Sequence, residues 1–120
     1  MTYQYYVPPM GYDEIVATQG EVIKDWTIGD WQGDYVYLLK NGDKYGFTVI
    51  GYGSCTGCDA LQGCENDKEF NELKEDIIKY IFWGTKQEVL DYAFNENANR
   101  WYYHEEDFVE IQEEIREMLK

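Results

Sequence analysis

The dipeptide Asn41-Gly42, which lies between two apolar runs, is the feature that most limits how this chain can fold. Asn and Gly tolerate positive φ angles, and a two-residue β-hairpin loop needs residues of this kind. The alternation of apolar residues on either side predicts two antiparallel strands over residues 35–40 and 44–50. A β-hairpin is therefore the expected centre of the fold.

The predicted hairpin has one apolar face. A two-residue loop places Leu38 opposite Tyr45 and Val36 opposite Phe47, so that apolar side chains meet across the strands. The opposite face of the hairpin then carries Tyr35, Tyr37 and Thr48. A further short strand is expected over residues 21–28, and residues 100–103 are candidates for an edge strand or a packed linker.

Helical patterns begin after the hairpin. Asn66 and Thr85 are predicted N-caps, because each has a Glu three positions later that completes a capping box. Gly84 is expected to end the first helix, and a last helix is expected over residues 105–119. The apolar stripe of the first helix consists of Phe70, Leu73, Ile77, Tyr80 and Ile81.

These elements predict an α+β fold, in which a small antiparallel sheet packs against about three C-terminal α-helices. The 120 residues are enough for a single domain with its own core. Residues 1–13 are rich in tyrosine and interrupted by prolines. They are expected to form an extended arm that is loosely held unless its tyrosines dock.

The charge of the chain restricts its partners. There are 24 Asp and Glu against 10 Lys and Arg, which gives a formal net charge of −14. Nucleic acid and anionic membrane surfaces repel such a chain, so direct binding to either is not expected. No apolar run is long enough to span a membrane. The preferred partner is therefore a basic surface, such as the groove of a nucleic-acid-binding protein.

The predicted last helix concentrates this charge. Residues 102–120 contain seven acidic and two basic residues. Spacings of three and four residues align part of them along one helix ridge, formed by Glu106, Glu110, Glu113 and Glu117. The ridge is the first candidate for contact with a basic partner, since its carboxylates are spaced along the axis much like phosphates. The alternative is an ordinary solvated helix face.

Four residues near the hairpin complete the predicted partner-binding set. Asp30 and Asp34 add carboxylates at the turn that precedes the hairpin. Tyr35 and Tyr37 add aromatic rings, which combine apolar area with a polar tip and suit a binding surface. Tyrosine is also a common filler of strand faces, which is the alternative reading of these rings.

A glycine-rich loop carries the three cysteines of the chain. Cys55 and Cys58 have the spacing of a metal or redox pair, and a zinc site would need Cys64 and the single histidine, His104, to complete it. A structural role is the more common outcome, in which the cysteines pack as small apolar residues. No metal or other cofactor is therefore expected.

The run Gly-Tyr-Gly-Ser-Cys-Thr-Gly-Cys-Asp-Ala-Leu-Gln at residues 51–62, with Gly33-Asp34-Tyr35 and the hairpin ahead of it, resembles a group of small bacteriophage-encoded proteins. The resemblance covers about residues 30–64. It implies an accessory protein that acts in the cytoplasm of an infected bacterium. It assigns no role to individual residues.

Together these observations predict a non-enzymatic inhibitor. The chain is expected to mimic nucleic acid and to occupy the groove of a basic host defence protein or nuclease, as anti-CRISPR and anti-restriction proteins do. One alternative is an interaction module that binds through its Tyr-rich sheet face. Another is a small zinc- or redox-dependent protein built on the Cys55/Cys58 loop. An enzyme is disfavoured because the chain has one histidine and no phosphate-binding glycine loop.

Overall fold

The computed structural model describes residues 6–54, 59–94 and 105–120, with the side chains of the last segment described from Val109 onward. Its centre is a four-stranded antiparallel sheet in the order β1-β2-β3-β4, so that each strand pairs with its neighbour in sequence. The strands are β1 (Glu21–Gly29), β2 (Gly33–Asn41), β3 (Lys44–Tyr52) and β4 (Phe82–Gly84).

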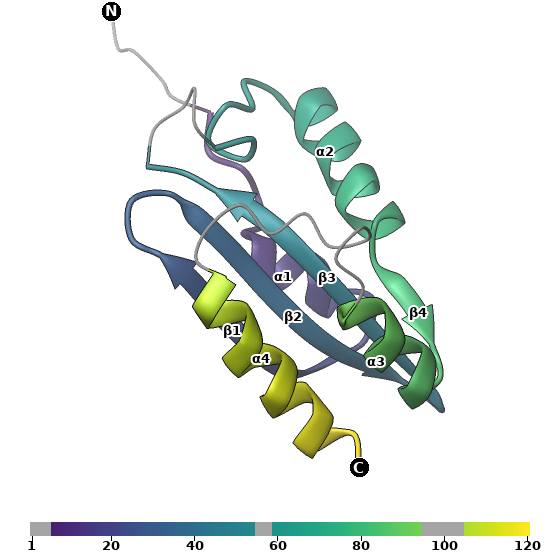
Figure 1. Ribbon diagram of the computed structural model, residues 1–120. Helices are drawn as coiled ribbons and strands as arrows, with labels where there is room; N and C mark the ends of the chain where they lie inside the picture. The colour runs from purple at the N-terminus through teal and green to yellow at the C-terminus, as the bar shows by residue number, and fades with distance from the viewer. Residues whose placement is uncertain (1–5, 55–58, 95–104) are drawn as a thin grey trace, which may run out of the picture.

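Helices cover both faces of this sheet. They are α1 (Tyr12–Ala17), α2 (Asp67–Lys79), α3 (Lys86–Ala93) and α4 (Glu105–Met118). Figure 1 shows α3 and α4 in front of the sheet and α1 behind it, and buried residues of α2 join the same cluster as those of α1. The α+β class is therefore confirmed, with a sheet that lies between two helical layers.

Strand β2 supplies the middle of both cores. Val36 and Leu38 are buried against α3 and α4, whereas Tyr37 and Leu39 are buried against α1 and α2. Successive side chains of a strand point to opposite faces of the sheet, so a strand that is buried on both faces has a continuous run of apolar residues in its sequence. The predicted separation of the two hairpin faces is confirmed.

The predicted pairing of the hairpin is wrong by two residues. Leu38 lies opposite Phe47, not Tyr45, and Val36 lies opposite Val49. Asn41 pairs with Lys44 as part of the ladder, so the loop consists of the next two residues. A shift of two residues keeps every side chain on its original face.

The turn chemistry explains this register. Gly42 has a φ of 63°, which is the conformation that glycine adopts at least cost. The side-chain amide of Asn41 donates a hydrogen bond to the carbonyl of Gln19, 2.8 Å away, outside the hairpin. Asn41 is therefore the last paired residue of β2, and its side chain makes a tertiary hydrogen bond instead of forming part of the two-residue loop.

The helix starts agree with the capping signals, but the first predicted stop does not. The side chains of Asn66 and Thr85 each accept a hydrogen bond from the backbone N–H three residues later. The predicted capping box is complete at Thr85 but not at Asn66, because the Glu69 side chain accepts from the backbone N–H of Glu65 instead. Helix α2 ends at Lys79, and Gly84 belongs to β4 instead of ending that helix. Tyr80, expected in the apolar stripe, is 72% exposed.

Helix α1 is the largest departure from the expected fold. Its residues Ile15 and Val16 are fully buried, and Tyr12 at its first position is 7% exposed. The described part of the fold therefore has one N-terminal helix besides the three C-terminal ones. The tyrosines of the expected arm do dock where they are described, since Tyr6 donates a hydrogen bond of 2.7 Å to Asp67. The candidate strand at residues 100–103 lies outside the described residues.

Candidate functional site

A pocket of about 450 Å³ opens between α1 and β1. Four separate parts of the chain line it: α1 with the residue before it, the middle of β1, the start of β2, and the loop that follows β3. The lining residues are Gly11, Tyr12, Asp13, Glu14, Asp25, Trp26, Thr27, Tyr35, Tyr37, Asp59, Leu61 and Gln62. We call this the acidic pocket.

The rim of the acidic pocket carries exposed carboxylates. Asp13 and Glu14 come from the first turn of α1, and Asp25 comes from β1. No lysine, arginine or histidine is among the described residues that line the pocket. Cations are favoured at such a rim, because nearby negative charges attract them and no internal base competes.

Tyrosines form the wall of the acidic pocket. The hydroxyl of Tyr37 donates a hydrogen bond of 2.5 Å to Asp13 Oδ1. The ring centroid of Tyr35 lies 5.8 Å from that of Tyr12 and 6.4 Å from that of Tyr37. Burial, followed by the hydrogen bond to Asp13, raises the pKa of Tyr37 well above its ordinary value. Its hydroxyl therefore stays neutral and keeps the Asp13 carboxylate oriented.

Asp59 anchors the loop side of the pocket. Its carboxylate is 6% exposed and accepts hydrogen bonds from the Tyr12 hydroxyl at 2.7 Å and from the backbone N–H of Gly53 at 2.9 Å. The backbone N–H groups of Leu61 and Gln62 also donate to it. A carboxylate with four donors is satisfied, so Asp59 positions its neighbours and is not free to bind a ligand.

Tyr52 fixes the pocket wall to the turn between β1 and β2. Its ring stacks on Tyr35 with centroids 4.3 Å apart and an angle of 22° between the rings. Its hydroxyl donates to the carbonyl of Ile28 at 3.1 Å. The Tyr35 ring therefore contacts three other tyrosine rings, which limits its freedom.

Helix α4 brings a further carboxylate to β1, on the opposite face of the sheet. The indole N–H of Trp26 donates a hydrogen bond to the Glu114 side chain. Because Asp25 and Trp26 are adjacent in a strand, their side chains point to opposite faces. Strand β1 thus has carboxylates beside it on both faces, from α1 and from α4.

The predicted α4 ridge is exposed but partly neutralised. Glu110, Glu113 and Glu117 are exposed. Arg116 lies 3.0 Å from Glu113, and Lys120 lies 3.0 Å from Glu117. Such surface ion pairs contribute little to stability, yet they lower the charge that the ridge presents. The side chain of Glu106 is outside the described part of the structure.

The four candidates near the hairpin divide into surface and core residues. Asp30 is exposed, and Tyr35 is partly buried in the pocket wall. Asp34 and Tyr37 are each 1% exposed, so neither side chain forms an open contact surface. Tyr37 still lines the pocket, where its hydroxyl donates a hydrogen bond to Asp13. The Tyr-rich face of the sheet is therefore largely covered by α1 and α2.

The cysteine loop is described only in part. Cys55, Cys58 and His104 lie outside the described residues, so the structure does not address a zinc or redox site there. Cys64 is buried in the same core as Phe70 and Ile77 of α2, and its thiol lies 3.4 Å from the carbonyl of Ala60. Burial raises the pKa of this thiol. Cys64 thus packs as a small apolar residue.

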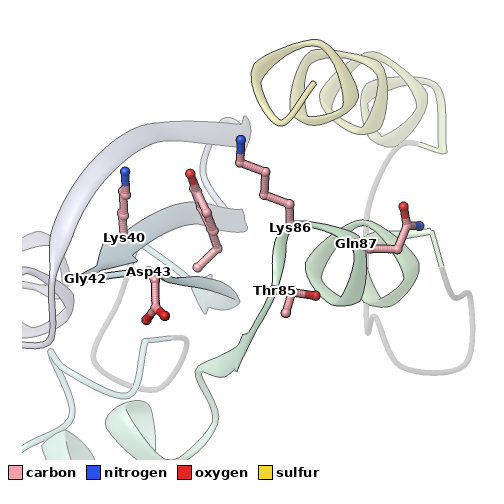
Figure 2. A pocket seen from close by; sticks show the side chains of 7 residues that line it. Lys40, Gly42, Asp43, Thr85, Lys86 and Gln87 are labelled. Carbon is pink, nitrogen blue, oxygen red and sulfur yellow. The ribbon is translucent and has the colours of Figure 1, made fainter.

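A second hollow, of about 630 Å³, lies at the other end of the hairpin and has the opposite charge. The ammonium groups of Lys40 and Lys86 lie 5.6 and 5.8 Å from the centroid of the Tyr45 ring. Figure 2 shows both amines on one side of the hollow, with Asp43 pointing the other way. Each lysine gains a cation–π contact there, which accounts for their convergence.

The sequence pattern missed most of the acidic pocket. Asp13, Asp25 and Asp59 are far apart along the chain, and only the packing of α1 on the sheet brings them together. The helices in the described segments are each too short or too polar to cross a membrane. The chain matches no protein-family model, no curated protein and no solved structure, so its function must be inferred from this surface chemistry.

Proposed function

We propose that this protein binds a basic, nucleic-acid-binding host protein, such as a nuclease or another defence protein, and inhibits it by occupying its groove. The observation that carries the proposal is the acidic pocket, which combines exposed carboxylates with aromatic walls and has no basic residue among its described lining. A bacteriophage origin and action in the host cytoplasm belong to the same proposal.

An arginine or lysine side chain of the partner is the expected occupant of the pocket. A guanidinium group pairs with carboxylates through charge-assisted hydrogen bonds, and it also stacks on aromatic rings. Asp13, Asp25 and Tyr35 offer both kinds of contact within one pocket. The hydrogen bond from Tyr37 to Asp13 holds one of the carboxylates in place beforehand, which lowers the entropy lost on binding.

The net charge of −14 acts over a longer range. It attracts a basic groove before contact, which raises the association rate at low ionic strength. Salt screens this attraction, because the Debye length falls from about 10 Å at 0.1 M to about 3 Å at 1 M. Inhibition is therefore expected to weaken steeply with added salt.

The competing proposal of binding through an open Tyr-rich sheet face has less support. That face is packed against α1 and α2, and Tyr37 is buried. The part of it that remains accessible is the wall of the acidic pocket, where the tyrosines lie beside carboxylates. The described surface favours an electrostatic partner over a neutral one.

The test is inhibition of a panel of purified bacterial nucleases and nucleic-acid-binding defence proteins. We expect this protein to displace DNA or RNA from at least one of them, with an inhibition constant that rises at least tenfold between 50 and 200 mM salt, as phosphate contacts do. Asp25→Lys should weaken that inhibition more than Glu75→Lys, which makes the same charge change on an exposed position of α2. Equal effects of the two variants would show that only the net charge of the protein matters. An inhibition constant that does not change with salt would contradict the proposed electrostatic inhibition.

A further inference from the structure

Among the described residues, strand β1 forms an open edge of the sheet. It is nine residues long, and within the described chain its backbone pairs with β2 alone. The opposite edge, β4, has only three residues. A strand paired on one side directs about half of its backbone N–H and C=O groups outward, where they are free to pair with another extended chain.

The edge is accessible along much of its length. Lys24, Asp25 and Thr27 are exposed, as is Glu21 at the start of the strand. The pairing of β1 with β2 shifts between Val22 and Lys24, where the strand carries one extra residue. Such a bulge interrupts a ladder. The regular part of the edge is therefore residues 24–29, which span about 20 Å at 3.4 Å per residue.

Carboxylates flank this edge on both faces. Asp25 and the α1 residues Asp13 and Glu14 belong to the acidic pocket, on the face that α1 covers. Glu114 of α4 lies on the opposite face, bonded to Trp26. Figure 1 shows α4 crossing in front of β1. Lys24 is the single basic residue of the strand.

The charge at the edge selects its occupant. Pairing with a second copy of this chain would bring two sets of carboxylates together, which is unfavourable. An extended basic segment places successive side chains on alternate faces, so one side chain reaches the acidic pocket and the next reaches Glu114. Two adjacent cationic residues would thus each meet a carboxylate.

We propose that residues 24–29 of β1 bind an extended, basic segment of a partner protein by β-strand addition, with adjacent Arg or Lys side chains on the two acidic faces. This inference rests on the proposed basic partner and adds the mode of binding. Backbone hydrogen bonds supply affinity in this mode, and the flanking side chains supply specificity.

The experiment uses eight-residue peptides with two adjacent central arginines in a Thr/Val background. One peptide is unmodified, a second carries N-methyl groups on alternate backbone amides, and a third carries the same number on consecutive central amides. The two methylated peptides have equal charge and equal methyl content. A strand methylated on alternate amides keeps one free edge that can turn toward β1, whereas consecutive methylation blocks both edges, so the alternately methylated peptide is the matched control.

Binding is measured by fluorescence anisotropy, and amide hydrogen exchange is followed in the same samples. We expect the unmodified and alternately methylated peptides to bind alike, and the consecutively methylated peptide to bind about tenfold or more weakly, because two or three net hydrogen bonds are lost. Amides of residues 24–29 should exchange more slowly in the complex. An all-glutamate peptide should not bind.

Two results would overturn the inference. Equal binding of both methylated peptides, without protection of β1 amides, would mean attraction by charge alone, and the proposed function would survive. Absence of peptide binding, while a basic protein of the panel is still inhibited, would also exclude strand addition. Failure of the proposed function is seen separately, as a lack of salt-sensitive inhibition across the panel.

Discussion

The hydroxyl of Tyr12 donates a hydrogen bond of 2.7 Å to Asp59 Oδ1 and so joins the first turn of α1 to the loop that follows β3. Asp59 accepts three further hydrogen bonds from backbone N–H groups. Asp59→Asn should lower the free energy of unfolding by about 1–3 kcal/mol, because an amide nitrogen replaces one acceptor and leaves a buried donor unpaired. Urea denaturation measures the effect.

Asp30→Asn is the control for this substitution, since Asp30 is exposed. It should change the free energy of unfolding by less than about 0.5 kcal/mol. Equal effects at the two positions would mean that the Asp59 hydrogen bonds do not hold the loop.

Alkaline pH should unfold the protein through its buried tyrosines. Burial, then hydrogen bonding to carboxylates, raises the pKa values of Tyr12 and Tyr37 above the ordinary value of 10.0. Because the pKa of each tyrosine is higher in the folded than in the unfolded state, its neutral hydroxyl stabilises the fold fully below pH 10. As the pH rises from there through the folded pKa, the free energy of unfolding falls by up to about 1.4 kcal/mol per pH unit for each tyrosine.

Tyr37→Phe tests this pH dependence in urea denaturation at pH 8, 10 and 11. The variant should lose less stability than the wild type between pH 10 and 11. Tyr80→Phe removes a tyrosine that is 72% exposed and should leave the slope unchanged. If the stability of Tyr37→Phe fell as steeply with pH as that of the wild type, the Tyr37 hydroxyl would not be a cause of the alkaline loss of stability.

Gly33 should not tolerate a side chain, whereas Gly51 on the paired strand should. A Cβ atom at Gly33 would lie 1.7 Å from the carbonyl oxygen of Ile28, but at Gly51 the nearest atoms are 3.9 Å away. Gly33→Ala is expected to lower the free energy of unfolding by about 1–3 kcal/mol or more through forced backbone movement. Gly51→Ala should be within about 0.5 kcal/mol of the wild type. Thermal unfolding of both variants compares the two sites, and similar melting temperatures would refute the expectation.

Thr85 caps α3 through a reciprocal pair of hydrogen bonds with Glu88. The hydrogen bond from the Thr85 backbone N–H, followed by that from its side chain, lowers the pKa of the Glu88 carboxyl group. Thr85→Ala should reduce the free energy of unfolding by about 1 kcal/mol at neutral pH. The stabilisation that arises from ionised Glu88 is lost as the pH falls through its folded pKa. Thr85→Ala keeps the backbone N–H that is the main cause of the shift, so the difference in stability between variant and wild type should change little in acid. Thr85→Ser keeps the hydroxyl and should remain close to the wild type in chemical denaturation.

Local sequence signals predicted the elements that depend on neighbouring residues. The two capping signals at Asn66 and Thr85 mark real helix starts, and the strands at residues 35–40 and 44–50 lie within β2 and β3. Helix α1 gave no comparable signal. It is six residues long, too short for a clear helical period, and the burial of Ile15 and Val16 against the sheet stabilises it.

Periodicity and composition, which the chain has before it folds, are enough to predict the α+β class, the two faces of β2 and the negative charge. The packing of the folded chain sets where that charge can act. It gathers Asp13 and Asp25 around buried tyrosines beside an open strand edge, whereas Glu113 and Glu117 pair with bases only three residues further along the chain. Distances between residues remote in sequence are set by packing, and local patterns do not encode them.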